Sequence, residues 1–444
     1  AAAERGVRFI ILGGTGGDAW TEDLERVNRL LRHLGIEHSG LGHTVTVGTR
    51  VIVKDREFIE FERPLDAVLP EYPVIRHSRG RLHEILQVAA PLLGGGGGST
   101  LAAISPAGGF VALNYAIYYE KRVDSIKWII NPFTFFRKAL GDSLFPIPDT
   151  TTVSGRRLYF SHVDGDALNN LAQFAPYLEP PGPWRCFRTR HTPEPYRDLP
   201  VTFGLVAGDI DPSIGGDYDA RNAVKQIFAL RKLQFVSHTY THPFEWQFFE
   251  DYQREQELAL IETQASRRSK RINAETFLKR LLRGREGDLD KYISHIDGLP
   301  RAYMKKPYRL AAETKSAIAL TEELAPQGKK VRLYQWSGDT TPYEAALAAT
   351  RAAGLRNING GDTRYDAFYP SIAYVAAISR TVGDERQIYA VNSNENTYTN
   401  DWEGPFYGLR SLVQTLDNTE RPRRLKGFNL YYHTYSAEKK SSLE

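Results

Sequence analysis

Two carboxylates mark the end of an apolar segment in the middle of the chain. Residues 158–166 read Leu-Tyr-Phe-Ser-His-Val-Asp-Gly-Asp, so a run of strand-forming residues ends in Asp164 and Asp166. Parallel α/β folds keep their chemistry at the carboxyl ends of their strands. One of these carboxylates is therefore expected to bind a cation, while the other stays available to accept a proton.

Two histidines follow another predicted strand, in the segment His238-Thr-Tyr-Thr-His242. The spacing would suit one face of a zinc-binding helix, but Pro243 disfavours helical geometry at His242 and the glutamate of H-E-x-x-H is absent. We therefore expect a loop at a strand end whose curl turns both rings inward. Together with Asp166 the pair forms a two-histidine, one-carboxylate zinc set, and two ordinary hydrogen-bonded histidines are the alternative.

His433 ends the segment Asn429-Leu-Tyr-Tyr-His433. A cation in such a site lowers the pKa of water from 15.7 to about 7 in the best-known zinc case, which makes hydroxide available near neutrality. His433 is then a candidate to protonate a leaving amine, and a buried core histidine beside Tyr431 and Tyr432 is the alternative. The predicted cofactor is one divalent cation, Zn²⁺ first, with other divalent ions left open.

Seven apolar segments are predicted to be strands: residues 158–162, 201–206, 233–237, 331–336, 356–359, 387–391 and 428–432. Helical patterns such as residues 219–230 and 343–353 alternate with them, which predicts a parallel barrel. Titratable side chains follow all seven strands: Asp164 and Asp166, Asp209, His238 and His242, Asp339, Asp362, Glu395, and His433. One rim would collect them at the carboxyl face of a distorted (β/α)7-type barrel.

The first part of the chain reads as a smaller Rossmann-like α/β accessory domain. Residues 7–12 are a predicted strand, residues 13–17 are Gly-Gly-Thr-Gly-Gly, and residues 24–34 are a predicted helix stopped by Gly35. The glycines do not have G-x-G-x-x-G spacing, so a tight turn explains them as well as a nucleotide does. Residues 81–90 are predicted to be a helix that Pro91 ends, and residues 94–99 have the composition of a flexible linker.

A Pro-rich connector follows a predicted amphipathic helix at residues 131–140. The predicted domains are residues 1–130 and 131–444, with a helical insertion at about residues 245–325.

Lys and Arg exceed Asp and Glu by 57 − 53 = 4, and these charges are spread along the chain. Nothing in this balance calls for nucleic acid or an anionic membrane, no apolar run is long enough for a membrane span, and the one cysteine, Cys186, forms no internal disulfide.

Several of these motifs, taken in order, resemble the NodB-homology polysaccharide deacetylases, closest to the Pel-type and galactosaminogalactan deacetylases. The resemblance covers roughly residues 131–444 and rests on the following segments: Ile147-Pro-Asp-Thr-Thr-Thr, Gly155-Arg-Arg, Phe160-Ser-His-Val-Asp-Gly-Asp, Ser237-His-Thr-Tyr-Thr-His-Pro-Phe-Glu-Trp, Trp336-Ser-Gly-Asp, Asn357-Ile-Asn-Gly-Gly-Asp-Thr, Asn394-Glu-Asn, Tyr398-Thr-Asn and Tyr431-Tyr-His.

The resemblance implies that Asp164 is the general base, that Asp166, His238 and His242 hold the metal, and that His433 is the general acid. One departure is that Thr341 precedes Pro342, where the wider superfamily has an arginine that orients the base. Candidates for substrate binding are Trp246, Trp336, Asp339, Asn359, Asp362, Glu395 and Trp402. Core packing is the alternative for the tryptophans.

The predicted function is metal-dependent N-deacetylation of an exopolysaccharide that contains N-acetylhexosamine, the activity of a carbohydrate esterase. The expected setting is periplasmic or secreted, in biofilm formation, with a polysaccharide substrate and an export complex as partners. Two alternatives remain open. One is a non-catalytic polysaccharide-binding component of an export assembly, and the other is a glycoside hydrolase with paired carboxylates.

Overall fold

A computed structural model describes residues 3–13, 24–90, 98–120, 125–141, 152–166, 168–169, 198–263, 298–360, 363–367, 369–375, 379–388, 408–422 and 424–437. The chain forms two compact units. The first contains residues 1–150, 365–375 and 418–423, and the second contains residues 151–364, 376–417 and 424–444. The main division therefore falls near residue 150, whereas the predicted division was at residue 130.

The first unit is built on a five-stranded sheet with the order β1-β7-β6-β5-β3. Its elements are η1 (Ala3–Arg5), β1 (Phe9–Leu12), α1 (Leu24–Leu31), η2 (Arg32–Leu34), β2 (Ile36–His43), β3 (Arg50–Lys54), β4 (Tyr72–His77), β5 (His83–Ala89), β6 (Ser99–Ser105), β7 (Gly108–Val111), β8 (Ile117–Glu120), β9 (Ser125–Trp128), α2 (Pro132–Leu140) and η9 (Ile372–Tyr374). The predicted helix stop at Gly35 is confirmed, because Gly35 has φ 80° in the left-handed region. Asn131 caps α2 by accepting a hydrogen bond from Thr134 N.

Two predictions for this unit are wrong. Only β1 and β7 pair in parallel, while β7 with β6, β6 with β5 and β5 with β3 are antiparallel, so the sheet is not Rossmann-like. The tight connection from β6 to β7 forces antiparallel pairing, since a parallel pair needs a long crossover. Residues 83–89 form strand β5 in place of the predicted helix, because β3 and β6 hydrogen-bond to both of its edges. Of the linker-like stretch, residues 94–97 lie outside the described residues, and Ser99 already begins β6.

The second unit contains a six-stranded sheet, ordered β16-β15-β14-β13-β12-β19, in which all neighbours are parallel. Its elements are β10 (Thr152–Val153), β11 (Arg156–Arg157), β12 (Tyr159–Asp164), β13 (Val201–Leu205), η5 (Ala207–Ile210), α3 (Ala220–Phe228), β14 (Leu233–Ser237), η6 (Trp246–Phe249), η8 (Ala312–Ser316), α5 (Ala317–Leu324), β15 (Leu333–Gln335), α6 (Glu344–Ala352), β16 (Arg356–Ile358), β17 (Ser379–Val382), β18 (Glu385–Ile388), α8 (Gly408–Asn418), β19 (Phe428–His433) and η10 (Thr434–Ala437).

The sheet curls strongly. Asn359 directly follows β16 and Asp164 ends β12, four strand spacings away in the sheet order. In a flat sheet this separation would be about 19 Å, yet Asn359 Nδ2 lies 2.8 Å from Asp164 Oδ2. The six strands therefore form a half-barrel whose carboxyl ends converge, and the structure leaves a complete (β/α) barrel unconfirmed.

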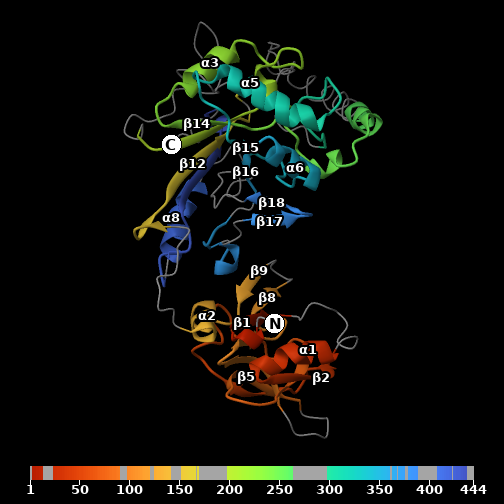
Figure 1. The fold of residues 1–444 in the computed structure, drawn as a ribbon, viewed down its shortest axis with the longest axis vertical. Helices are drawn as coiled ribbons and strands as arrows, with labels where there is room; N and C mark the ends of the chain where they lie inside the picture. Colours follow the sequence, from red (N-terminus) through yellow and green to blue (C-terminus); the bar gives the residue numbers. More distant parts are fainter. Residues whose placement is uncertain are drawn as a thin grey trace, which may run out of the picture. The chain divides into compact units, whose positions relative to one another are not determined.

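Helices α3 and α5 cover this sheet on one side, where both contact β14 and each other (Figure 1). Apolar side chains fill the layer between them, among them Phe203, Val224, Phe228 and Phe235. Helix α5 lies inside the predicted insertion of residues 245–325, but it is the crossover between β14 and β15 and belongs to the sheet's helical layer. Residues 264–297 of that insertion lie outside the described residues.

Six of the seven predicted strands belong to this parallel sheet. The seventh, at residues 387–391, is also a strand in its described part, which lies in β18, but its expected place in the parallel sheet is wrong, because β18 pairs antiparallel with β17. The two strands are joined by Gly383 and Asp384, and Gly383 has φ 57°. A Gly-Asp pair between two extended segments is a hairpin signal, so the sequence contained the information. No helix in the described ranges combines the length and apolar character needed to cross a membrane.

Candidate metal centre and active site

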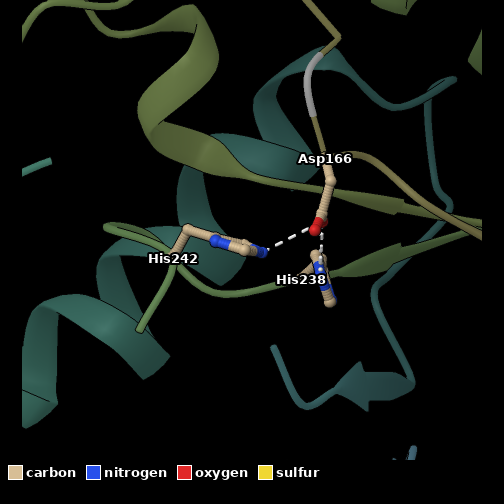
Figure 2. A group of neighbouring side chains, drawn as sticks. All are labelled: Asp166, His238 and His242. Atoms are coloured by element: carbon tan, nitrogen blue, oxygen red, sulfur yellow. Dashed lines mark hydrogen bonds and ion pairs between the residues drawn. The ribbon is translucent and has the colours of Figure 1, made fainter. Parts of the chain in front are cut away.

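Three predicted ligands converge at the carboxyl end of the half-barrel (Figure 2). Asp166 Oδ1 lies 2.9 Å from His238 Nε2 and 3.0 Å from His242 Nε2. The side chains are 11%, 1% and 6% exposed in that order, so the site is buried and reaches solvent mainly beside Asp166. Asp166 follows β12 and both histidines follow β14, which brings together residues some seventy positions apart.

Local backbone geometry places the two carboxylates and the two rings. A Cβ at Gly165 would lie 2.3 Å from Gly204 O, so only glycine lets the end of β12 approach β13 this closely. Thr239 and His242 have φ 72° and 54°, in the left-handed region. The segment is therefore a curled loop with both rings turned inward, which confirms the loop predicted from Pro243.

The residues fit a divalent cation. His238 Nδ1 is 3.1 Å from Gln335 O, to which it donates, so its Nε2 lone pair faces Asp166 as ligation requires. His242 Nε2 is buried, and Asp166 Oδ1 at 3.0 Å is its one polar contact within the described residues. A buried carboxylate and two imidazole nitrogens converging on one point match the donor set of catalytic zinc sites.

The charges at this point are strongly coupled. Burial opposes ionisation of Asp166, but His242 and His238 outweigh it and hold the pKa of Asp166 well below its ordinary value. Burial opposes protonation of His238, but Asp164 and Asp166 outweigh it and raise its pKa. The site therefore attracts positive charge, which a divalent cation would supply in place of ring protons.

Asp164 is not among the three clustered ligands and is held from one side. Its Oδ2 accepts hydrogen bonds from Asn359 Nδ2 at 2.8 Å and from the Tyr431 hydroxyl at 2.6 Å. Its Oδ1 is buried and has no hydrogen-bond partner among the described residues. Asp164 Oδ2 is 3.6 Å from His238 Nε2. This arrangement leaves one oxygen of an oriented carboxylate available to take a proton next to the predicted cation.

His433 joins the same cluster through Tyr431. Its Nε2 lies 3.1 Å from the Tyr431 hydroxyl, and its Nδ1 lies 2.7 Å from the Tyr435 hydroxyl. Burial and Asp164 hold the pKa of Tyr431 well above its ordinary value, so its single proton stays on the hydroxyl and is donated to Asp164. His433 Nε2 therefore carries a proton, which it donates to the Tyr431 oxygen.

Sequence reasoning missed the residues that connect these groups. His162 Nε2 lies 3.3 Å from Asn359 Oδ1, its Nδ1 lies 3.3 Å from Asn429 Nδ2, and its ring stacks on Tyr431. Burial lowers the pKa of His162 to about 4, so it is a neutral ring. The parallel register pairs His162 with Tyr431 and Asp164 with His433. Side chains two residues apart on a strand point to the same face, so His162 and Tyr431 could have been predicted to share the face of Asp164 and His433.

Asp209, predicted at the rim after β13, is buried at 5% exposed and accepts a hydrogen bond from the Tyr303 hydroxyl. Burial raises the pKa of Asp209 to about 7. The carboxyl group is therefore largely protonated below neutrality.

The predicted sugar-binding tryptophans Trp246 and Trp336 must be corrected. Both are 0% exposed, and their rings pack against each other at 4.9 Å in a core cluster with Tyr334 and Tyr343. No face of either indole is available to a pyranose ring, so we withdraw both as substrate contacts.

The other substrate-binding candidates divide into two groups. Asp339 is exposed and closes a turn by accepting from Thr341 N and Thr341 Oγ1, while Asn359 is 1% exposed and serves Asp164. Asn359 is therefore corrected from a substrate contact to a residue that orients Asp164. Asp362, Glu395 and Trp402 lie outside the described residues.

Comparison with known proteins found no relative of this chain. No family model matches the chain, and neither a curated protein nor a solved structure matches it.

Proposed function

We propose that this protein is a metal-dependent amide hydrolase that removes N-acetyl groups from N-acetylhexosamine units of a polysaccharide and releases acetate. The observation that carries the proposal is the separation of roles within one cluster. Three side chains converge as ligands, while Asp164 and His433 stand beside them with their own hydrogen-bond partners. Amide hydrolysis needs these parts: a cation, a proton acceptor for water and a proton donor for the amine.

The chain's own residues accept and deliver the protons. Asp166, His238 and His242 would hold a divalent cation, which would supply Lewis acidity toward the acetamide carbonyl and would lower the pKa of water. Asp164 Oδ1 accepts the proton as a water oxygen attacks the carbonyl carbon, because Asn359 and Tyr431 occupy Oδ2. For this step the His433 ring is the imidazolium, with Nδ1–H directed at the Tyr435 hydroxyl. It gives its Nε2 proton to the sugar nitrogen as the C–N bond breaks and becomes the neutral ring, leaving acetate and a free amine.

Neutral donors replace the superfamily arginine in this arrangement. Thr341 stands before Pro342, and its side chain donates to Asp339 Oδ2 at 2.7 Å and not to Asp164. An asparagine amide and a tyrosine hydroxyl orient the base instead, so the orienting groups bring no cation beside Asp164.

The proposal of a polymeric substrate rests on the motif resemblance to polysaccharide deacetylases. That resemblance implies a periplasmic or secreted protein that acts on an exopolysaccharide, within an export or biofilm assembly. Solvent reaches the ligand cluster mainly at Asp166, which has the largest exposed fraction of the three. We therefore expect the acetamide group to enter on the Asp166 side.

The test measures acetate release from partially acetylated galactosamine and glucosamine polymers, with chelator and after addition of Zn²⁺. We expect activity that chelator removes and Zn²⁺ restores. Asp164→Asn and His433→Ala should each lower kcat about 10²- to 10⁴-fold and still bind metal. The matched control is Asp384→Asn, which changes an exposed carboxylate in the β17–β18 turn.

Three outcomes would contradict the proposal. Near-native acetate release by Asp164→Asn or His433→Ala would remove that residue from the mechanism. Shortened chains without free acetate would indicate a glycoside hydrolase. Bound metal with no acetate released from any acetylated hexosamine polymer would indicate a binding component.

A further inference from the structure

A buried glutamate contacts the loop that carries the two histidine ligands. Glu313 is 0% exposed and lies in η8, a π-helical turn at Ala312–Ser316. Its Oε2 accepts from Tyr240 N at 2.8 Å and from Thr241 N at 2.9 Å, and its Oε1 accepts from the Thr241 hydroxyl. All three donors lie between His238 and His242, so one carboxylate binds the middle of the ligand loop.

The backbone of this loop adopts a conformation that is unfavourable for its residue types. Thr239 and His242 flank the Glu313 contacts and have φ 72° and 54°. Side chains other than Asn, Asp and Gly rarely adopt this region, and threonine, which is branched at Cβ, disfavours it further. In this conformation the backbone N–H groups of Tyr240 and Thr241 both point at the Glu313 carboxylate.

Glu313 itself is fixed from behind. The Tyr334 hydroxyl, on strand β15, donates to Glu313 O at 2.9 Å, and Tyr334 is 0% exposed. Glu313 lies within the π-helical turn, a type of turn that occurs frequently at functional sites. Among the described residues no lysine or arginine forms an ion pair with Glu313, so its hydrogen bonds go to the loop.

We propose that Glu313 is a positioning residue of the metal centre, whose carboxylate holds residues 239–242 in the turn that directs His238 Nε2 and His242 Nε2 at one cation. The inference rests on the proposed metal centre, but not on the deacetylation reaction. It deepens the proposed function by assigning a residue that touches neither metal nor substrate.

Two substitutions separate the carboxylate's geometry from its charge. Glu313→Ala removes all three contacts, and we expect Zn²⁺ affinity to fall about 10- to 100-fold, as when other outer-sphere partners of metal ligands are lost. Glu313→Gln keeps the shape: its oxygen can accept both backbone N–H groups while its amide donates to the Thr241 hydroxyl. We expect it to retain most of the wild-type affinity.

The readouts are Zn²⁺ affinity by competition with a chromophoric chelator and the visible absorption of the Co²⁺-loaded protein, neither of which requires turnover. The Co²⁺ spectrum should change in Glu313→Ala and not in Glu313→Gln. The matched control is Glu322→Ala on α5. Glu322 also accepts a loop backbone N–H, from Val331 at 3.0 Å, away from the histidine loop. That control should lower stability without changing Zn²⁺ affinity.

If Glu313→Ala does not fold, Glu313→Asp replaces it, since the shorter side chain keeps the charge but withdraws the carboxylate from the loop. We expect a loss of Zn²⁺ affinity in the same range. Wild-type affinity and an unchanged Co²⁺ spectrum in either variant would overturn the positioning role and leave the proposed function standing. A wild-type protein that binds no divalent ion would overturn both.

Discussion

Replacement of Asn359 by glycine tests whether a neutral amide orients the proposed base. Asn359 Nδ2 donates to Asp164 Oδ2 and to Trp336 O, both at 2.8 Å, while its Oδ1 faces His162. Asn359 has φ 106°, where a Cβ is strained, so glycine removes the side chain without adding strain as alanine would. In Asn359→Gly, Tyr431 is the hydrogen-bond donor to Asp164 that remains within the described residues.

The expected magnitude follows from the lost contact. A hydrogen bond to a charged group contributes about 1.5–3 kcal/mol. At about 1.4 kcal/mol for each factor of ten, loss of this orientation should lower kcat/KM about 10- to 150-fold. The fall should appear in kcat with little change in KM, because Asn359 is buried and does not contact the substrate. The orphaned Trp336 O and His162 should also lower the free energy of unfolding by about 1–3 kcal/mol.

The assay is steady-state acetate release by the Zn²⁺-loaded protein, together with urea unfolding. The matched control is Asn357→Ala. Asn357 is partly buried and accepts hydrogen bonds from Trp336 Nε1 and Ile388 N through its Oδ1, but no hydrogen bond joins it to Asp164. It should lower stability and leave kcat within a few-fold of wild type. An unchanged or increased kcat in Asn359→Gly would refute the reasoning, since it would mean that Tyr431 suffices or that the amide restrains the base.

Three further predictions follow from burial and from the metal centre. Burial raises the pKa of Asp209 to about 7 from 3.8, so the folded state holds this proton more tightly and its stabilising effect is lost as pH rises through 7. Asp209→Asn should therefore gain roughly 2–3 kcal/mol over wild type between pH 5 and pH 8 in urea unfolding, and a pH-independent difference would contradict the shift. Zn²⁺ at 100 times its Kd should stabilise the protein by about 2.7 kcal/mol, seen as a rise in Tm that chelator reverses. His242→Ala should abolish this rise, and a persisting rise would place the metal elsewhere. Trp246→Ala should cost about 3–5 kcal/mol of stability at unchanged KM, whereas a raised KM at wild-type stability would restore Trp246 as a sugar contact.

Local sequence patterns were sufficient to predict the strands of the parallel sheet and the residue types of the candidate site. The strand at residues 233–237 and the helices at residues 131–140 and 219–230 show periodicity and end signals in their own residues, and each agrees with an observed element to within a few positions. The loop at His242 was predictable because a following proline acts on its immediate neighbour. The segment at residues 81–90 was misassigned because short apolar runs suit helix and strand alike, and partners in β3 and β6 decide between them.

The sequence by itself determined that Asp166, His238 and His242 are a plausible ligand set, since residue type and position after a strand are local properties. Only the tertiary structure decided that both imidazole Nε2 atoms lie within 3.0 Å of Asp166 Oδ1. It also decided that Trp246 is core, and that Asn359, Tyr431 and Glu313 serve the site. These roles depend on the curl of the sheet and on contacts between residues from 72 to 267 positions apart. No local pattern encodes such contacts, because they exist only once the strands have paired.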